Sequence, residues 1–177
     1  MDIKEYNHCV KIHSDSLYRF ALQHVSDTAA AEDAVQDSFV QLWQHCDRVD
    51  VNQAKAYLFT VVRNQIIDLF RHKKIEQQYA EEVQTKGGST AFSQQVETKD
   101  ALQKALSRLP DIQKDILLLR EWDGFSYKEI ADILNVSEQQ VMVYLFRARV
   151  TMRKKLTEEG YSENKRPLKN NSNETEQ

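Results

Sequence analysis

The C-terminal third of this chain contains two helix-start signals, one shortly after the other, and they limit its fold more than any other feature. Ser126 followed by Glu129 is a capping box, and Ser137 followed by Gln140 is another. In a capping box, each of the two side chains accepts a hydrogen bond from the other residue's backbone N–H. The sequence therefore predicts one helix over residues 127–134 and a second that begins directly after Ser137.

The turn between these two helices has only three residues, Asn135, Val136 and Ser137. Asparagine tolerates the left-handed backbone that so sharp a turn requires, and Ala131 is small where the second helix has to approach the first. The apolar residues predicted for a shared core are Ile130, Leu134, Val136, Val141 and Tyr144. Together these features predict a DNA-binding helix-turn-helix, whose second helix enters the major groove. The alternative is an ordinary helical hairpin.

The rest of the chain also has the periodicity of helices. Four Gly and two Pro in 177 residues leave little material for tight turns, which disfavours an all-β fold. Apolar residues recur at helical spacing between Ala34 and Trp43, and again between Leu58 and Leu69. We therefore predict an all-α fold.

The pattern divides the chain into two small helical domains joined by a flexible linker. Helical periodicity disappears over residues 77–95, where Gly87-Gly88 is the clearest flexible point. We predict a first domain at 1–76 and a second at 96–156, which contains the helix-turn-helix. Residues 157–177 have almost no apolar side chains and are predicted to be a disordered tail.

The net charge of −3 hides a difference between the two domains. Residues 1–71 carry 7 basic and 10 acidic side chains, whereas residues 104–156 carry 10 basic and 7 acidic ones. The stretch 144–156 has five basic side chains and no acid. Such a run next to a DNA-reading helix is well placed to neutralise phosphates, although a solvated helix end would have the same composition.

Several classes of protein are disfavoured by what the sequence lacks. No apolar run approaches 18 residues and the N-terminus does not resemble a signal peptide, so we expect a cytoplasmic protein without stable membrane insertion. Cys9 and Cys46 are isolated and fit no standard metal-ligand spacing, so no disulfide, metal or other cofactor is predicted. The sequence also lacks a Gly-rich phosphate loop and a recognisable nucleophile–base motif, and we predict no enzymatic activity.

Three segments, in this order, resemble the bacterial extracytoplasmic-function (ECF) RNA polymerase sigma factors of the sigma-70 family. They are DTAAAEDAVQDSFVQLWQH, AYLFTVVRNQIIDLFRHKK and LPDIQKDILLLREWDGFSYKEIADILNVS, the last followed by VYLFRAR. The resemblance covers about residues 6–156. It implies that the first domain corresponds to sigma region 2 and the second to sigma region 4, without the additional domains of housekeeping sigma factors.

By this resemblance, the helix that contains EDAVQDSFVQLW binds the clamp helices of the largest catalytic subunit of core RNA polymerase. The residues expected to contact the polymerase are Glu32, Asp33, Gln36, Asp37 and Gln41. The alternative for these side chains is a solvated helix face. For Trp43, a place in the core is favoured over contact with the polymerase.

The next segment corresponds to the part of the family that faces the −10 promoter element. Holding single-stranded DNA requires basic and polar side chains along its backbone and surfaces for its unpaired bases. The residues expected to supply these contacts are Arg63, Asn64, Arg71, Lys73 and Lys74. Asp68 is expected to be structural, paired with Arg71 or a neighbouring turn, and the loop at 45–53 matches the family's base-capturing loop in position.

In region 4, the second helix of the helix-turn-helix corresponds to the part that reads the −35 promoter element. The residues expected to contact this DNA are Glu138, Gln139, Gln140, Met142, Val143, Arg147 and Arg149. Glutamine can bind adenine with two hydrogen bonds, and arginine can bind guanine or phosphate. The family commonly has a small residue at position 139 and a lysine at position 142. Met142 therefore removes a phosphate contact and makes the start of the helix more apolar.

The sequence predicts an alternative sigma factor of the ECF type, which binds core RNA polymerase and directs it to particular promoter DNA. The resemblance also implies an anti-sigma factor as a partner. The alternative is a conventional helix-turn-helix regulator that acts on duplex DNA without being a polymerase subunit. Such a regulator has no reason to carry the two N-terminal segments in this order.

Overall fold

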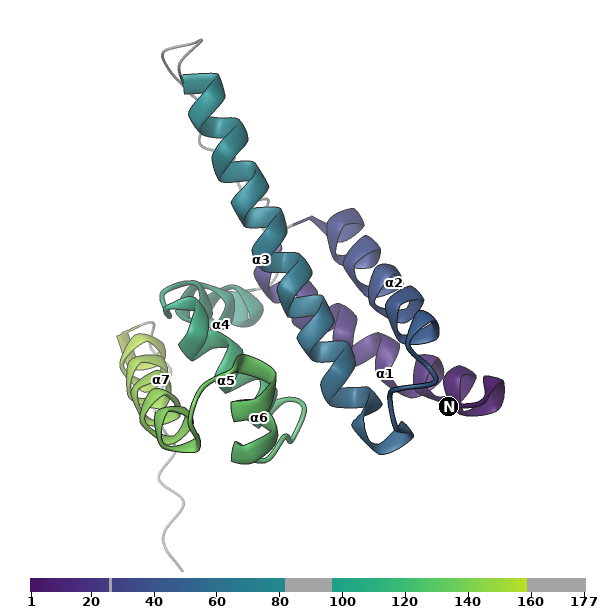
Figure 1. Ribbon diagram of the computed structural model, residues 1–177. Helices are drawn as coiled ribbons and strands as arrows, with labels where there is room; N and C mark the ends of the chain where they lie inside the picture. The colour runs from purple at the N-terminus through teal and green to yellow at the C-terminus, as the bar shows by residue number, and fades with distance from the viewer. Residues whose placement is uncertain (26, 82–96, 159–177) are drawn as a thin grey trace, which may run out of the picture.

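The computed structural model describes the backbone of residues 1–25, 27–81 and 97–158, and the side chains of these residues except 73–81 and 97–100. The described residues form seven α-helices and one short 3-10 helix, which confirms the predicted all-α fold (Figure 1). The helices are α1 (Ile3–His24), α2 (Thr28–Gln44), η1 (Val51–Gln53), α3 (Ala54–Glu81), α4 (Glu97–Ser107), α5 (Asp111–Glu121), α6 (Tyr127–Leu134) and α7 (Glu138–Glu158).

Helices α1, α2 and α3 pack against one another and form the first domain. Asp2 begins α1 with a capping box closed by Glu5, and Asp27 begins α2 by accepting hydrogen bonds from N–H groups of the first turn. On α3, Leu58 and Val62 of the predicted apolar stripe are fully buried. Removal of such side chains from water is the main favourable contribution that holds the three helices together.

Helices α4 to α7 form the second domain, in which α6 and α7 are the predicted helix-turn-helix. Both capping boxes are present: Glu129 Oε2 accepts the Ser126 N–H at 2.7 Å, and Gln140 Oε1 accepts the Ser137 N–H at 2.9 Å. Hydrogen bonds from the hydroxyl and N–H of Ser126 lower the pKa of Glu129. Asn135 has the predicted left-handed backbone, with φ of 53°. The core residues predicted for this motif are buried or half-buried: Ile130, Leu134, Val136, Val141 and Tyr144.

Replacing Asn135 by Val is expected to lower the free energy of unfolding by about 1–2 kcal/mol, because a β-branched residue is strained at positive φ. Urea denaturation of the purified protein measures this change. Asn135→Gly is the matched control, since glycine adopts positive φ without strain, and we expect it to stay within about 1 kcal/mol of the wild type. Equal losses in both variants would show that side-chain contacts of Asn135 matter and its backbone angle does not.

The two domains pack against each other, with α1 and α3 on one side and α5 and α6 on the other (Figure 1). The ring of Phe59 on α3 contacts Phe20 of α1 and Phe125, which precedes α6, at centroid distances of 5.4 and 5.1 Å. All three rings are almost fully buried. Lys55 Nζ donates to the Asp123 carbonyl oxygen at 2.5 Å across the same contact. The sequence predicted two domains but not this contact, because helical periodicity does not identify the distant residues that a helix meets.

Two boundaries differ from the prediction. Helix α3 continues to Glu81, into the segment predicted as linker, because residues 77–81 contain no Gly or Pro that would end it. Helix α7 continues to Glu158, just into the predicted tail. Gly87-Gly88 and the remainder of the tail, 159–177, lie outside the described residues.

Candidate functional site

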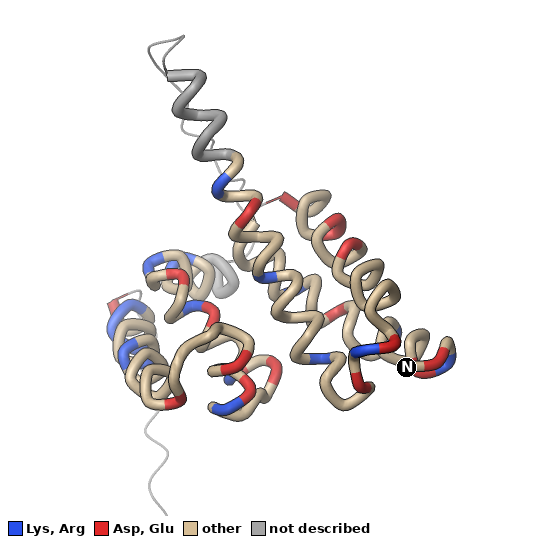
Figure 2. The backbone as a smooth tube through the Cα atoms, in the orientation of Figure 1, with Lys and Arg blue, Asp and Glu red and all other residues tan. Residues whose placement is uncertain are grey.

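The outer face of α2 carries the side chains predicted to contact the polymerase. Glu32, Asp33, Gln36 and Asp37 are exposed, and Gln41 is half-buried. Figure 2 shows acidic residues along this helix. Asp33 and Asp37 are about one helical turn apart, so their side chains project from the same side. The fold therefore brings the predicted residues together on one surface.

Two exposed apolar residues, which the sequence did not predict as contacts, complete this surface. Val40 is 51% exposed and Trp43 is 46% exposed. The prediction that Trp43 belongs to the core is wrong: its ring packs edge-on against Tyr6 of α1, at a centroid distance of 5.0 Å, and stays half exposed. An apolar centre with a polar rim is typical of protein-binding surfaces. We refer to Asp33, Gln36, Asp37, Val40 and Trp43 as the α2 face.

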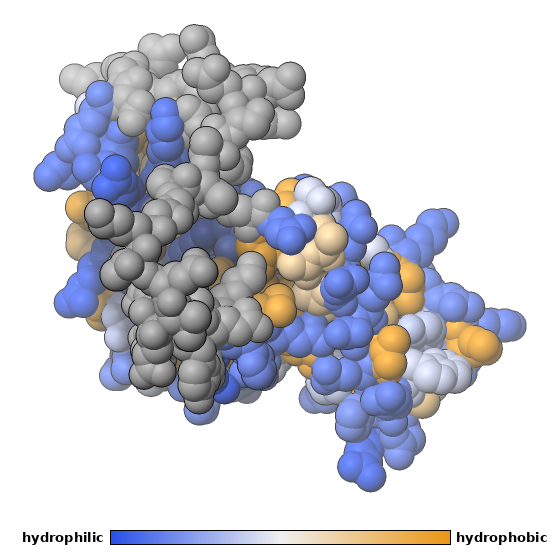
Figure 3. Space-filling model, turned by 90° about the horizontal axis from the view of Figure 1, so that it is seen from above, coloured by the Kyte–Doolittle hydropathy of each residue, from blue (hydrophilic) through white to orange (hydrophobic). Residues whose placement is uncertain are grey.

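Exposed large apolar side chains occur on both domains. On the face of the molecule in Figure 3, hydrophobic residues lie in small groups among hydrophilic ones. Small groups of this kind need an explanation only where they coincide with other functional features. Val40 and Trp43 meet that condition, since they share one helix face with two carboxylates.

Along α3, most residues predicted to face the −10 element are open to solvent where they are described. Asn64 and Arg71 are exposed. Arg71 Nη1 donates to Asp68 Oδ1 at 2.8 Å, which confirms the predicted pair. The backbone of Lys73 and Lys74 continues α3, but their side chains lie outside the described residues.

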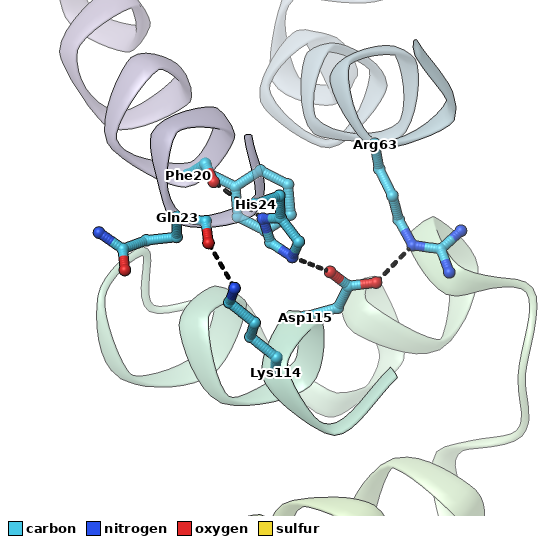
Figure 4. Close-up of polar contacts among 6 residues, drawn as sticks. All are labelled: Phe20, Gln23, His24, Arg63, Lys114 and Asp115. Carbon is cyan, nitrogen blue, oxygen red and sulfur yellow. Dashed lines mark hydrogen bonds and ion pairs between the residues drawn. The ribbon is translucent and has the colours of Figure 1, made fainter. Parts of the chain in front are cut away.

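Arg63 points to the contact between the two domains. Its side chain is 19% exposed, and its Nε donates to Asp115 Oδ2 of α5 at 2.7 Å (Figure 4). The other carboxylate oxygen of Asp115 lies 2.7 Å from His24 Nε2, at the end of α1. Neither Asp115 nor His24 could be predicted as a partner of Arg63, because both lie far from it along the chain.

All the residues predicted to read the −35 element are exposed on α7. They are Glu138, Gln139, Gln140, Met142, Val143, Arg147 and Arg149. Gln140 also caps the helix, because its Oε1 accepts the Ser137 N–H. Arg149 Nε donates to Glu121 Oε1 at 3.0 Å, a contact within the second domain. Figure 2 shows that basic residues dominate the charge of α7 beyond its first turn.

An apolar row runs along α7 beside these polar residues. Phe146 is 69% exposed, and Met142 and Val150 are each exposed by about half. The three are spaced by four residues and therefore lie on one side of the helix. Phe146 was not predicted, because only charged and amide side chains and the first apolar positions of the helix were considered as DNA contacts.

The second domain also has an apolar groove between α4, α5 and α7. Its volume is about 520 Å³, and its lining includes Leu106, Leu118 and Met152. Trp122 also lines it and is 41% exposed. Such a groove has the shape and polarity that suit the apolar face of a helix.

Both domains match known sequence families. Residues 9–75 match Sigma-70 region 2, and residues 99–152 match Sigma-70, region 4. The ECF RNA polymerase sigma factor SigM of Bacillus subtilis (strain 168) is 33% identical over 142 residues, which cover 78% of this chain and 87% of SigM. The chain belongs to the ECF sigma factors of the sigma-70 family.

Other relatives of this sigma factor are similar over most of their length. SigW of Bacillus subtilis is 28% identical over 161 residues, covering 83% of this chain and 86% of SigW. The co-crystal structure of the sigma factor RpoE with the anti-sigma factor NepR from Bartonella quintana aligns with a TM-score of 0.73 and 26% identity. That alignment covers 88% of this chain and 98% of the matched chain. CnrH, solved with the cytosolic domain of CnrY, has the same fold, with a TM-score of 0.65 at 22% identity.

These matches decide between the two functions that the sequence left open. A conventional helix-turn-helix regulator would not match Sigma-70 region 2 over residues 9–75, so the sigma-factor prediction is confirmed. Within the residues that the structure describes, no helix is long and apolar enough to cross a membrane. The same residues contain no group of three or more His, Cys, Asp or Glu side chains placed to hold a metal ion.

Proposed function

We propose that this sigma factor binds core RNA polymerase through the α2 face and directs it to promoters whose −10 and −35 elements contact α3 and α7. The main support is that the regions matching Sigma-70 regions 2 and 4 each present predicted contact residues on an exposed helix side. The protein has no catalytic activity of its own. It acts in the cytoplasm, where it supplies promoter recognition to the polymerase.

The α2 face combines two kinds of contact. Asp33 and Asp37 attract a basic surface and fix the orientation of the two proteins as they meet. Val40 and Trp43 are then buried in the centre of the interface, where an aromatic ring contributes much of the binding energy. The polymerase surface that fits is therefore a basic one with an apolar centre.

The −10 surface on α3 holds single-stranded DNA. Arg63, Arg71, Lys73 and Lys74 neutralise backbone phosphates, and Asn64 offers a polar contact. Because phosphate contacts carry no sequence information, this surface positions the strand, and its binding weakens as salt rises.

The −35 surface on α7 reads duplex DNA in the major groove. Arg147 binds guanine or phosphate, and the amide of Gln139 binds adenine. Met142 and Phe146 lie on one exposed side of α7, at positions where a more polar helix would have side chains that contact phosphates. Apolar side chains recognise the C5-methyl group of thymine. We therefore propose a −35 element that presents thymine methyl groups to this row.

Replacing the contacted thymines by uracil in the −35 element of a duplex promoter should weaken binding of the complex between this protein and core RNA polymerase about fourfold per methyl group, since burial of one methyl contributes about 0.8 kcal/mol. Fluorescence anisotropy with an oligonucleotide from a transcribed promoter measures this. Phe146→Ala should bind the two duplexes with equal affinity. Ile12→Ala, which removes an exposed apolar side chain from α1, is the control and should keep the preference for thymine. A Phe146→Ala variant with an undiminished preference would contradict this role of the row.

An anti-sigma factor is the third partner we propose. The co-crystal structure of RpoE also contains the anti-sigma factor NepR. This chain is 26% identical to RpoE over most of both chains, which supports a partner of the same kind here. The apolar groove of the second domain, with Trp122 in its lining, offers a site for an apolar helix of that partner.

Co-elution of the full-length protein with purified bacterial core RNA polymerase in size-exclusion chromatography tests the proposed function. We expect a complex at micromolar concentrations and no tight binding of duplex promoter DNA by the protein alone. The opposite pair of results, binding to duplex DNA without any complex with core polymerase, would overturn the proposal in favour of a conventional regulator.

A further inference from the structure

A buried ionic cluster joins the two domains. Asp115 of α5 has a side chain that is only 5% exposed, with His24 of α1 at one carboxylate oxygen and Arg63 of α3 at the other, each at 2.7 Å (Figure 4). Lys114, the neighbour of Asp115, donates from Nζ to the carbonyl oxygen of Gln23. Two consecutive residues of the second domain are thus bonded to both α1 and α3 of the first.

The His24 ring lies between two oxygen atoms. Its Nδ1 faces the Phe20 carbonyl oxygen at 2.9 Å, while its Nε2 faces Asp115 Oδ1 at 2.7 Å. The His24 ring and the Arg63 guanidinium therefore lie on either side of the Asp115 carboxylate, one from each of two helices of the first domain.

The same cluster engages one of the residues proposed to bind DNA. A carboxylate and a DNA phosphate offer the Arg63 guanidinium the same kind of contact, a negatively charged oxygen in line with its N–H groups. Arg63 cannot donate its Nε–H to both at once, and with the domains packed together its side chain is largely buried. Asp115 and the promoter strand are therefore competitors for Arg63.

We propose that Asp115 is an intramolecular latch, which occupies Arg63 in place of a DNA phosphate and holds the sigma factor in a closed resting form until the two domains separate. This inference rests on the proposed role of Arg63 at the −10 element. It assigns to the packed arrangement a function in withholding DNA binding, in addition to its contribution to stability.

The contact between the domains also depends on pH. On the same domain contact, burial raises the pKa of Asp123 to about 6, although Lys55 of α3 and Arg19 of α1 act against this.

Asp123 favours closure at lower pH. When domain separation exposes Asp123, its pKa returns to about 3.8, so closure loses stability as pH rises from there to about 6.

The test compares three forms of the full-length protein: the wild type, Asp115→Asn and Asp111→Asn. Asp111 is the matched control, because it lies on the same helix, lines the same cleft and loses the same charge, but is exposed. Small-angle X-ray scattering gives the radius of gyration, and anisotropy gives affinity for a fluorescent oligo(dT) of about 12 nucleotides, a length within the range of single-strand sites. We expect Asp115→Asn to be more extended and to bind about fivefold more tightly, as expected when a charged competitor is removed.

Three results separate the latch from the proposed function. A radius of gyration and an affinity for Asp115→Asn equal to those of Asp111→Asn would overturn the latch. Tighter binding that survives in Asp115→Asn combined with Arg63→Ala would overturn the competition for Arg63. No oligonucleotide binding by any variant, with Asp115→Asn still extended, would overturn the DNA role of Arg63 itself.

A second measurement does not depend on Asp115 variants. The wild type should become more extended as pH rises from about 4 to about 6, because burial raises the pKa of Asp123 to about 6 in the closed form. Asp123→Asn carries no titratable proton at this position, so most of this pH response should disappear. An unchanged response in Asp123→Asn would overturn the part assigned to Asp123.

Discussion

An Asp33→Lys, Asp37→Lys double variant is expected to bind core RNA polymerase at least about 100-fold more weakly than the wild type. Both carboxylates are exposed on one side of α2, so lysines there place like charges against the basic surface that we expect on the polymerase. Removing one partner of a close interfacial charge pair typically costs about 2–5 kcal/mol, and reversal adds repulsion. Competition with a labelled sigma factor for a limited amount of core polymerase measures the loss.

Asp15→Lys is the control for this double variant. Asp15 is a highly exposed acid on α1, with 83% of its side chain accessible, and it lies outside the α2 face. We expect it to bind core polymerase within about twofold of the wild type, since exposed charges away from an interface contribute little. A double variant that competes as well as Asp15→Lys would show that α2 does not contact the polymerase.

A Phe59→Ala variant is expected to lose about 3–5 kcal/mol of the free energy of unfolding. Phe59 has no exposed surface and its ring contacts Phe20 and Phe125, so its removal leaves a cavity that touches both domains. Urea denaturation followed by circular dichroism measures the change. The loss is large compared with the stability of an ordinary domain, so the variant should unfold at a much lower urea concentration.

Phe59→Leu separates the volume of the ring from its position. Leucine fills most of the space, and the expected loss is below about 1.5 kcal/mol. Similar losses for Ala and Leu would point to the aromatic edge contacts, and no loss for either would contradict the packing of the two domains around this ring.

The elements that could be predicted are those specified by neighbours in the sequence. The α6–turn–α7 unit needs only two capping boxes, one asparagine and a short turn, all within a few residues of one another. The predicted starts of both helices and the predicted left-handed backbone of Asn135 are therefore confirmed. The exposed polar side of α2 followed from periodicity in the same way.

The contacts between the domains could not be predicted, because they join residues far apart in the sequence. Arg63 and Asp115 are 52 residues apart, and each is unremarkable within its own helix. Helical spacing predicted that Trp43 lies on the apolar side of its helix, but it could not identify the residue that its ring contacts. That residue is Tyr6, and the contact leaves the Trp43 ring half exposed. The sequence pattern predicted the surfaces that we propose for DNA and polymerase, while the relation of Arg63 to the second domain required the folded structure.

In vitro transcription is the most direct test of whether this protein directs promoter-specific initiation. Purified core RNA polymerase is incubated with and without this sigma factor on the DNA upstream of the gene that encodes it. We expect promoter-specific transcripts that require the sigma factor and are lost with the Asp33→Lys, Asp37→Lys double variant. Transcription no different from that of core polymerase alone, or equally strong with the double variant, would contradict it.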